Sequence, residues 1–263
     1  MKIITSVVNN PVFIEIQHYT LKKFFKGDYE FIVFNDAKAF PDFTNGNDIT
    51  IKKQINETCN KLNIKCINIE NNHHKHLDMS TRHADTFNNH VTSFQLKNPD
   101  KYILLDSDMF LVDDFDIDRY SKYHSAIVLQ TRKNEGYLWP GLCYFDMTKM
   151  KNFELINWSL MPGFDSGGMT KEWLKKQLTS DIYFIKHLSS CSWSIDELPP
   201  NLHDNTRLVE FFKSDVRNID GKFFCEIYDG VFLHYRAGGN WRNEGLEMHK
   251  QLSNTLKNCL CND

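Results

Sequence analysis

The chain has 263 residues, of which 41% are hydrophobic, 25% charged and 13% aromatic, a composition typical of a globular protein with a sizeable core. Its 31 lysines and arginines against 34 aspartates and glutamates give a net charge of −3, so no positive field exists to hold a polyanion. Nucleic acid is therefore not an expected partner. A mean hydropathy of −0.48 without a long apolar run excludes a membrane span.

The first ten residues lead directly into a strand-like run and lack the apolar helix and cleavage site of a signal peptide. Seven cysteines without a CxxC pair fit reduced thiols, and we interpret Cys259 and Cys261 as ordinary thiols of a terminal helix. Both observations predict a cytoplasmic protein. The absence of an internal repeat or a Pro/Ser-rich linker predicts a single compact domain over residues 1–263.

Apolar runs and helical stripes alternate through the first half of the chain. Pro11 suits a first helical turn, and Gly27 supplies a stop. The predicted elements are strands at 2–8, 30–34, 64–69 and 102–105, and helices along 13–24, 51–62 and 84–94. This alternation favours an α/β fold with a mostly parallel sheet covered by helices on both faces. Such sheets bind ligands at the carboxyl ends of their strands.

The second half of the chain is less regular. We expect strands at 126–130, 142–145 and 223–234, a mostly helical segment at 171–188, and a closing amphipathic helix at 244–260. By its place in the fold, this half is expected to build the pocket of a second substrate.

The sharpest feature is an apolar strand, Tyr102–Leu105, that ends in Asp106-Ser107-Asp108 and is followed by apolar residues again. Carboxylates in such surroundings cost free energy unless they are paired or bind a cation. In an extended chain, residues two apart project to the same side with Cα atoms about 6.5 Å apart, so both carboxylates can flank one divalent ion. Oxygen ligands suit Mg²⁺ or Mn²⁺. The alternative is an exposed turn in which one carboxylate caps a backbone group.

A second strand-like run, Gly230–His234, ends in a histidine and is followed by two arginines and a glycine pair. His234 offers an imidazole ligand, Gly238 permits close backbone approach, and Arg236 and Arg242 can bind an anion. Together with the two carboxylates, the imidazole forms an oxygen-oxygen-nitrogen set that favours Mn²⁺ over Mg²⁺.

These two motifs resemble the nucleotide-sugar glycosyltransferases of the GT-A fold, most like the group of glycogenin and bacterial galactosyltransferases. The resemblance covers residues 1–115 by pattern and 230–241 by motif. The late motif of the family reads H-x-x-G-x-x-K-P-W, whereas here Ala237 replaces the glycine, Asn240 replaces the lysine and Trp241 comes one residue early. Since the lysine is missing, Arg236 or Arg242 is expected to contact the leaving diphosphate.

The resemblance implies a Rossmann-like GT-A sandwich in which residues 1–115 bind the donor and residues 116–263 bind the acceptor. It implies transfer of a sugar from a nucleoside diphosphate sugar, with a UDP-sugar as the first guess, to a saccharide or another hydroxyl acceptor. The metal ligands would be Asp106, Asp108 and His234, with Mn²⁺ or Mg²⁺ as cofactor. The donor-binding residues would be Thr5, Ser6, Val7, Asp36, Arg82, Asp85, Asn89, Asp106, Ser107, Arg236, Gly238 and Arg242.

Some of these roles have alternatives. Arg82, Asp85 and Asn89 share one helix face, which can equally be a solvated surface. Asp181, where the family carries D-Q-D, and Asp165, a loop acid, are the candidate catalytic carboxylates. The alternatives are a helix surface for Asp181 and a turn for Asp165. Trp139-Pro140-Gly141 can line the sugar pocket or serve packing.

Other functions fit the sequence less well. Histidines 73, 74 and 76 form a cluster, and His76, His83 and His90 recur every seven residues, which could suggest zinc. Because the first group sits in a polar, asparagine-rich loop and no cysteine lies at finger spacing, we interpret that group as a solvated loop. A nucleotidyltransferase would carry a glycine-rich basic loop after the first strand, and a haloacid dehalogenase phosphatase would have glycine and threonine where Met109 and Phe110 stand. A non-catalytic sugar-binding module of the same fold is the third alternative.

Overall fold

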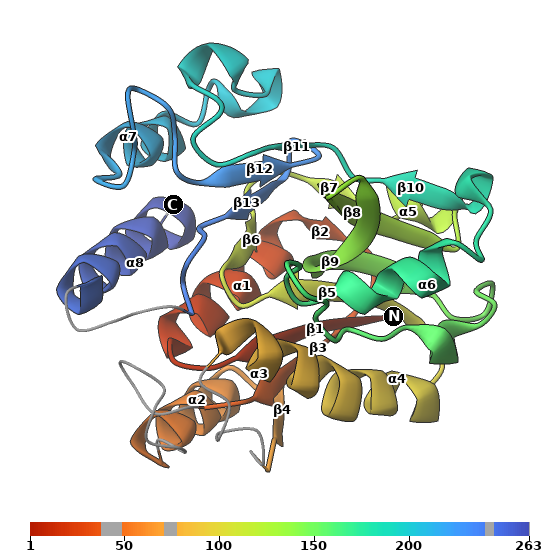
Figure 1. Cartoon of the computed structure of the whole chain (residues 1–263). Coiled ribbons are helices and arrows are strands. Elements are labelled where there is room, and N and C mark those ends of the chain that lie inside the picture. The colour runs from red at the N-terminus through yellow and green to blue at the C-terminus, as the bar shows by residue number, and fades with distance from the viewer. Residues whose placement is uncertain (38–48, 71–77, 240–244, 263) are drawn as a thin grey trace.

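The computed structural model describes residues 1–37, 49–70, 78–239 and 245–262. A seven-stranded sheet forms its centre, with the strand order β10-β8-β9-β5-β1-β3-β4 (Figure 1). Its strands are β1 (Lys2–Val7), β3 (Glu30–Asn35), β4 (Lys65–Asn68), β5 (Lys101–Asp106), β8 (Ser125–Arg132), β9 (Glu135–Asp146) and β10 (Ile182–Phe184).

The central sheet is mostly parallel. β1 pairs in parallel with β3 and with β5, β3 with β4, and β8 with β10, whereas β9 runs antiparallel to both β5 and β8. The predicted α/β class and the predicted strands of the first half are confirmed. In the second half, the strand expected at 142–145 is the end of the longer β9.

A second, smaller sheet has the order β11-β12-β13-β6 and is antiparallel. Its strands are β6 (Met109–Leu111), β11 (His187–Leu188), β12 (Glu226–Tyr228) and β13 (Phe232–His234), and a further pair consists of β2 (Phe25–Lys26) and β7 (Phe115–Asp116). Because β6 follows β5 after only two residues, the chain passes directly from the central sheet into the small one at Ser107 and Asp108.

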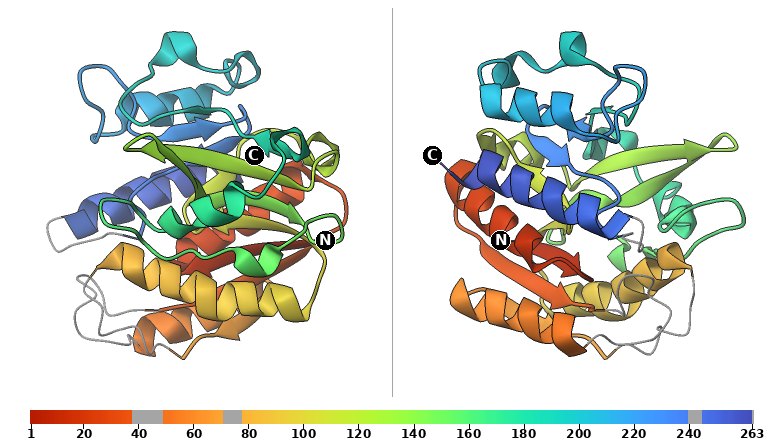
Figure 2. Two further views of the ribbon diagram at one scale, coloured as in Figure 1. Left: turned by 45° about the vertical axis from the view of Figure 1, so that its right-hand side comes forward. Right: turned by 90° about the vertical axis from the view of Figure 1, so that its left-hand side faces the viewer.

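Helices cover both faces of the central sheet (Figure 2). α1 (Pro11–Phe24) and α2 (Ile49–Lys61) pack on one face. The other face is covered by α6 (Lys171–Leu174) and by a continuous helix of α3 (Met79–Thr86), the π-helical segment η2 (Phe87–Thr92) and α4 (Ser93–Lys97). A third apolar cluster joins α1 to the small sheet, to α7 (Thr206–Ser214) and to α8 (Leu246–Cys261). α8 lies alongside α1. The remaining α-helix, α5 (Asp118–Ser121), is a single turn.

Local sequence explains where α1 begins. The Asn10 side chain caps the helix by accepting a hydrogen bond from the backbone N–H of Val12 at 3.1 Å, and Pro11 occupies the first turn. The stripe that predicts this helix consists of Phe13, Ile16, Thr20 and Phe24, of which the first three are buried and Phe24 is partly buried. The helix ends at Phe24, before Gly27 with a φ of 121°.

The prediction of a mostly helical segment at 171–188 is wrong. Only Lys171–Leu174 is α-helical, and β10 and β11 occupy the end of that segment. Pairing of β10 with β8 satisfies backbone groups at a sheet edge, and this tertiary interaction overrides local helix propensity. The predicted strand at 223–234 is instead the hairpin of β12 and β13, with Asp229 and Gly230 at positive φ in its turn. The predicted closing helix is confirmed as α8.

The described residues contain no helix with both the length and the apolar character needed to cross a bilayer. All seven cysteines carry free thiols, as predicted.

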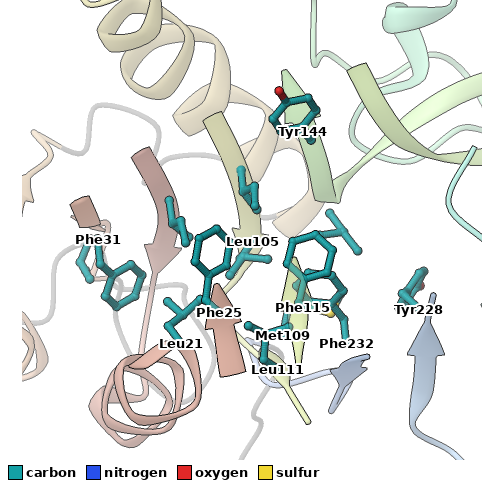
Figure 3. Close-up of a cluster of buried hydrophobic side chains, with 14 of the residues drawn as sticks. Leu21, Phe25, Phe31, Leu105, Met109, Leu111, Phe115, Tyr144, Tyr228 and Phe232 are labelled. Atoms are coloured by element: carbon teal, nitrogen blue, oxygen red, sulfur yellow. The ribbon is translucent and has the colours of Figure 1, made fainter. Parts of the chain in front are cut away.

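Phe115 belongs to the apolar cluster that joins the two sheets, together with Leu105 of β5 and Phe232 of β13. Its ring lies 4.9 Å from that of Phe232 on β13 and 5.0 Å from that of Tyr120, and Figure 3 shows it beside Met109 and Leu111. Because Phe115 and Phe232 come from segments far apart in the chain, the junction of the two sheets depends on this packing.

Phe115→Ala is expected to lower the free energy of unfolding by about 3–5 kcal/mol, since it removes a fully buried aromatic ring and leaves a cavity. Denaturant unfolding followed by circular dichroism measures this loss. Phe184→Ala, at a position 38% exposed, is the control and should cost no more than about 0.5 kcal/mol. Equal losses in both variants would contradict the assignment of Phe115 to the core junction.

Candidate metal centre

Three side chains with metal-ligand chemistry converge where the chain leaves the central sheet. One ligand atom from each of Asp106, Asp108 and His234 lies within 4.8 Å of the others. Asp108 and His234 are buried, and Asp106 is partly buried. The predicted meeting of two carboxylates with a distant imidazole is therefore present in the structure.

Strand pairing brings these residues together. β6 and β13 are antiparallel neighbours in which Met109 lies opposite His234, so Asp108, one residue before Met109, lies beside the end of β13. The backbone N–H of Tyr235 donates to the Asp108 carbonyl oxygen at 2.9 Å, which extends this pairing past the strand. The extended geometry assumed for Asp106 to Asp108 is wrong, because Ser107 and Asp108 form a turn. That turn lets β5 and β6 belong to different sheets.

Gln17 anchors this turn from α1. Its side-chain amide, which is fully buried, donates to the carbonyl oxygens of Asp106 at 2.8 Å and of Met109 at 3.1 Å. Both flanks of the aspartate motif are thus fixed to the helix. Ser6, paired with Asp106 across the parallel strands, has a buried hydroxyl without a hydrogen-bond partner among the described residues.

Two carboxylates hold the imidazole of His234. Its Nε2 lies 3.2 Å from Asp108 Oδ1, and its Nδ1 lies 2.8 Å from Glu226 Oε2. Burial alone would lower the pKa of His234, but Asp108 and Glu226 outweigh it and raise the pKa to about 10. Burial likewise opposes ionisation of Glu226, yet His234 and the Tyr228 hydroxyl lower its pKa to about 2.

The charge balance of the cluster favours a cation. Burial and then the neighbouring Asp108 raise the pKa of Asp106, whereas His234 lowers the pKa of Asp108 against the effect of its burial. Among the three ligand residues, two carboxylates stand beside one imidazole, and the repulsion between Asp106 and Asp108 favours a cation between them. Two carboxylates and an imidazole whose second nitrogen is held by a carboxylate fit Mn²⁺ or Mg²⁺, because this outer partner fixes the ring for coordination through Nε2.

A pocket of about 470 Å³ opens in front of the cluster. Several predicted donor-binding residues line it: Ser6, Arg82, Asp106, Ser107, Arg236 and Gly238. Trp139 also lines the pocket, which agrees with the prediction that Trp139-Pro140-Gly141 can line a sugar pocket. The ring centre of Trp139 lies 5.0 Å from that of His234 and 5.4 Å from that of Tyr228, on which the indole stacks.

Other predicted donor-binding side chains do not reach the pocket. Thr5, Val7 and Asp36 are at most 1% exposed, and Asp36 accepts a hydrogen bond from the Thr86 hydroxyl at 2.6 Å, so their side chains face the interior rather than a ligand. This corrects the expectation of direct side-chain contact.

The helix that carries Arg82 also carries Asp85 and Asn89, one and two turns further on. The Asn89 amide donates to Asp85 at 2.6 Å on the outer surface, and neither residue lines the pocket. The solvated-face interpretation therefore describes Asp85 and Asn89, and only Arg82 faces the site. Arg242 lies outside the described residues.

The two candidate catalytic acids have different positions. Asp165 lines the pocket, accepts hydrogen bonds from the Ser80 hydroxyl and the Ser166 N–H, and lies 4.0 Å from Arg132. Asp181 is exposed and precedes β10 at the amino end of the parallel strands.

Strand register shows how far Asp181 lies from the metal centre. Ile182 is level with Ser125, Phe145 and Tyr102, which puts Asp181 five residues, or about 16 Å, below Asp106 along the strands. The three intervening strand spacings add about 14 Å sideways. Asp181 cannot act on a substrate bound at the cluster, and its predicted catalytic role there is wrong.

Three residues of the site escaped the sequence analysis. Glu226 lies directly opposite His234 in the β12–β13 hairpin, but that region had been predicted as one strand. Gln17 offered a single sequence signal, a polar side chain next to the buried stripe of a predicted helix, and the sequence analysis did not use it. His83 lines the pocket, with its Nδ1 at 3.3 Å from the Ser166 hydroxyl, although the sequence analysis gave it no role at the site. The predicted solvated loop of His73, His74 and His76 lies outside the described residues.

No protein-family model matches this chain, and no curated protein shows significant sequence similarity to it.

Gly238→Ala is expected to weaken Mn²⁺ binding by about 10–100-fold, the loss typical of disturbed outer-shell partners. The Gly238 N–H donates to Asp108 Oδ2 at 2.8 Å, and a Cβ at this position would lie 2.7 Å from that oxygen and 2.6 Å from the Phe13 ring. Isothermal titration calorimetry with MnCl₂ measures the affinity.

Gly239→Ala is the matched control for this substitution. Its Cβ would meet nothing nearer than Val8 at 3.5 Å, an ordinary contact. Similar Mn²⁺ affinities for the two alanine variants would contradict a role for the Gly238 amide in shaping Asp108.

Proposed function

We propose that this protein is a metal-dependent glycosyltransferase of the GT-A type that transfers a sugar from a nucleoside diphosphate sugar to a hydroxyl acceptor. The observation that carries the proposal is the convergence of Asp106, Asp108 and His234 at the carboxyl end of β5, on the wall of a pocket large enough for a substrate. In open sheets of this kind, ligands bind beyond the carboxyl ends of the strands.

Asp106, Asp108 and His234 would hold the metal, with Mn²⁺ expected before Mg²⁺ because one ligand is nitrogen. When bound, such an ion supplies Lewis-acid stabilisation of the negative charge that develops on a diphosphate leaving group. Glu226 orients the imidazole, and the Gly238 amide orients the carboxylate of Asp108. These outer contacts keep the ligand atoms in place before the substrate arrives.

Cationic side chains on the pocket wall support binding of a diphosphate. Arg236 lines the pocket, donates to the Ser190 hydroxyl at 2.7 Å and has its Nε 3.9 Å from Glu226. These contacts fix its guanidinium near the ligand set, where it can pair with phosphate oxygens in place of the lysine of the family motif. Arg82, almost fully buried, adds a second positive charge to the lining of the pocket.

Asp165 is the carboxylate best placed to serve the acceptor. It lies on the pocket wall formed by the second half of the chain, and the hydrogen bonds from Ser80 and Ser166 orient one of its oxygens. We propose that the other oxygen accepts the proton of the acceptor hydroxyl as that hydroxyl attacks the anomeric carbon.

Asp108→Asn should weaken Mn²⁺ binding by more than about 100-fold, because it replaces a ligand carboxylate, and should abolish metal-dependent UDP binding. Calorimetric titration of UDP with and without MnCl₂ tests this expectation. Asp114→Asn, which changes a nearby exposed acid paired with Lys26, should bind both as the wild type does. Unchanged metal-dependent UDP binding in the Asp108 variant would refute the metal assignment.

Asp165→Asn should reduce sugar transfer by about 10²-fold or more while UDP and Mn²⁺ affinities stay unchanged, because a base for the acceptor contributes to the reaction and not to donor binding. Donor consumption and product formation, screened over a panel of UDP-sugars and saccharide acceptors, provide the readout. Full transfer activity in this variant would remove Asp165 from the mechanism.

A screen widened to phosphate esters and to nucleoside triphosphates with sugar phosphates separates the proposal from its rivals. A glycosyltransferase releases UDP from the donor, whereas a phosphatase releases inorganic phosphate from phosphate esters, and a nucleotidyltransferase releases pyrophosphate from a nucleoside triphosphate and a sugar phosphate. Release of phosphate or pyrophosphate without any release of UDP would replace the proposed function by the corresponding rival.

A further inference from the structure

A strained turn follows the histidine ligand. Arg236 and Ala237 have φ values of 67° and 58°, so two consecutive residues with side chains adopt the left-handed conformation that glycine usually occupies. Such strain persists only where surrounding contacts impose it, and it is concentrated at functional sites. Residues 235–238 therefore need an explanation beyond local preference.

This turn is bonded to Asp108 at both ends. The Tyr235 N–H donates to the Asp108 carbonyl oxygen at 2.9 Å, and the Gly238 N–H donates to its Oδ2 at 2.8 Å. Only a tight turn returns the backbone to the same aspartate after three residues. If Arg236 and Ala237 relaxed to an extended conformation, the Gly238 amide would leave the carboxylate.

The contact that fixes the strained turn comes from Arg217. Its Nη1 donates to the carbonyl oxygen of Arg236 at 2.9 Å. Its guanidinium lies 4.0 Å from the centre of the Tyr235 ring and 4.6 Å from that of Phe224, so aromatic faces confine it as well.

Asp215 in turn holds Arg217 in a two-pronged ion pair. Arg217 Nε donates to Asp215 Oδ1 at 2.8 Å, and Nη2 donates to Oδ2 at 2.6 Å. The side chains are only 8% and 1% exposed. Buried ion pairs of this kind are poor sources of stability, since well-packed apolar residues would serve as well, but their fixed geometry suits positioning.

We propose that the Asp215–Arg217 pair is a positioning device for the metal centre. By holding the Arg236 carbonyl oxygen, Arg217 keeps the turn left-handed, which places the Gly238 amide on Asp108 and sets the direction of the Asp108 carboxylate. The same clamp fixes the backbone from which the Arg236 side chain reaches the pocket. This inference rests on the metal centre of the proposed function, and it extends that centre to two residues that touch neither the metal nor a substrate.

Arg217→Lys tests the clamp, because lysine keeps the charge but loses the planar fork that bonds Asp215 and Arg236 together. We expect Mn²⁺ affinity, measured by calorimetry, to fall roughly 10-fold, at the lower end of the range for outer-shell partners. We also expect the amides of 235–238 to exchange hydrogen faster in the metal-free protein. Adding Ala237→Gly to this variant should restore both properties in large part, since glycine adopts the left-handed conformation without the clamp.

Arg119→Lys is the matched control. Arg119 Nη1 also donates to the carbonyl oxygen of a left-handed residue, Asp229, at 3.0 Å, but in the hairpin turn away from the ligands. Its Mn²⁺ affinity should equal that of the wild type. Circular dichroism would show that both lysine variants remain folded.

Two results would overturn the clamp: wild-type Mn²⁺ affinity and exchange rates in a folded Arg217→Lys variant, or a loss that Ala237→Gly does not relieve. The exchange measurement needs no metal. If the wild type fails to bind Mn²⁺ while the exchange results are as expected, the proposed function falls and the clamp on the turn stands.

Discussion

Negative charge gathered in a poorly solvated place is the constraint on which this structure depends. Asp106, Asp108 and Glu226 meet around His234 where two sheets join. The imidazole contacts Asp108 and Glu226 directly, so Asp106 stands beside Asp108 without an ion-pair partner among the described residues. Such a cluster is unfavourable unless its members are rigidly hydrogen-bonded and its remaining charge finds a cation. The surrounding bonds, from the Gln17 amide to the Gly238 N–H, follow from that requirement.

The first half of the fold could be predicted from the sequence because its signals are local. Apolar stripes at helical spacing, Pro11 at a helix start and Gly27 after its end each act within a few residues, and parallel strands then require the alternation. The region 171–188 could not be predicted in the same way. Its strands β10 and β11 exist through pairing with β8 and β12, partners that no local pattern announces.

In the candidate site, too, the residues with a local sequence signal could be predicted and those placed by tertiary contacts could not. Asp106, Asp108 and His234 stand out because polar residues at the ends of apolar strands are conspicuous in any sequence. Glu226 and Arg217 do not, since their importance arises from the hairpin register and from a strained turn that only coordinates reveal. Asp181 shows the converse error. A partial motif match selected this acid, but it precedes β10, and the direction of β10 places it at the end of the sheet opposite the cluster.

The position of the cluster links ligand binding to the assembly of the fold. Asp106 ends a strand of the central sheet, whereas His234 ends a strand of the small sheet, and the covalent link between the sheets at this point is the two-residue turn of Ser107 and Asp108. A cation held by all three ligands would therefore tie the two sheets together, and its binding free energy would add to the stability of their junction. Conversely, any change that loosens the small sheet separates the ligands, so affinity at this site reports on packing around Phe115 as well as on the ligands themselves.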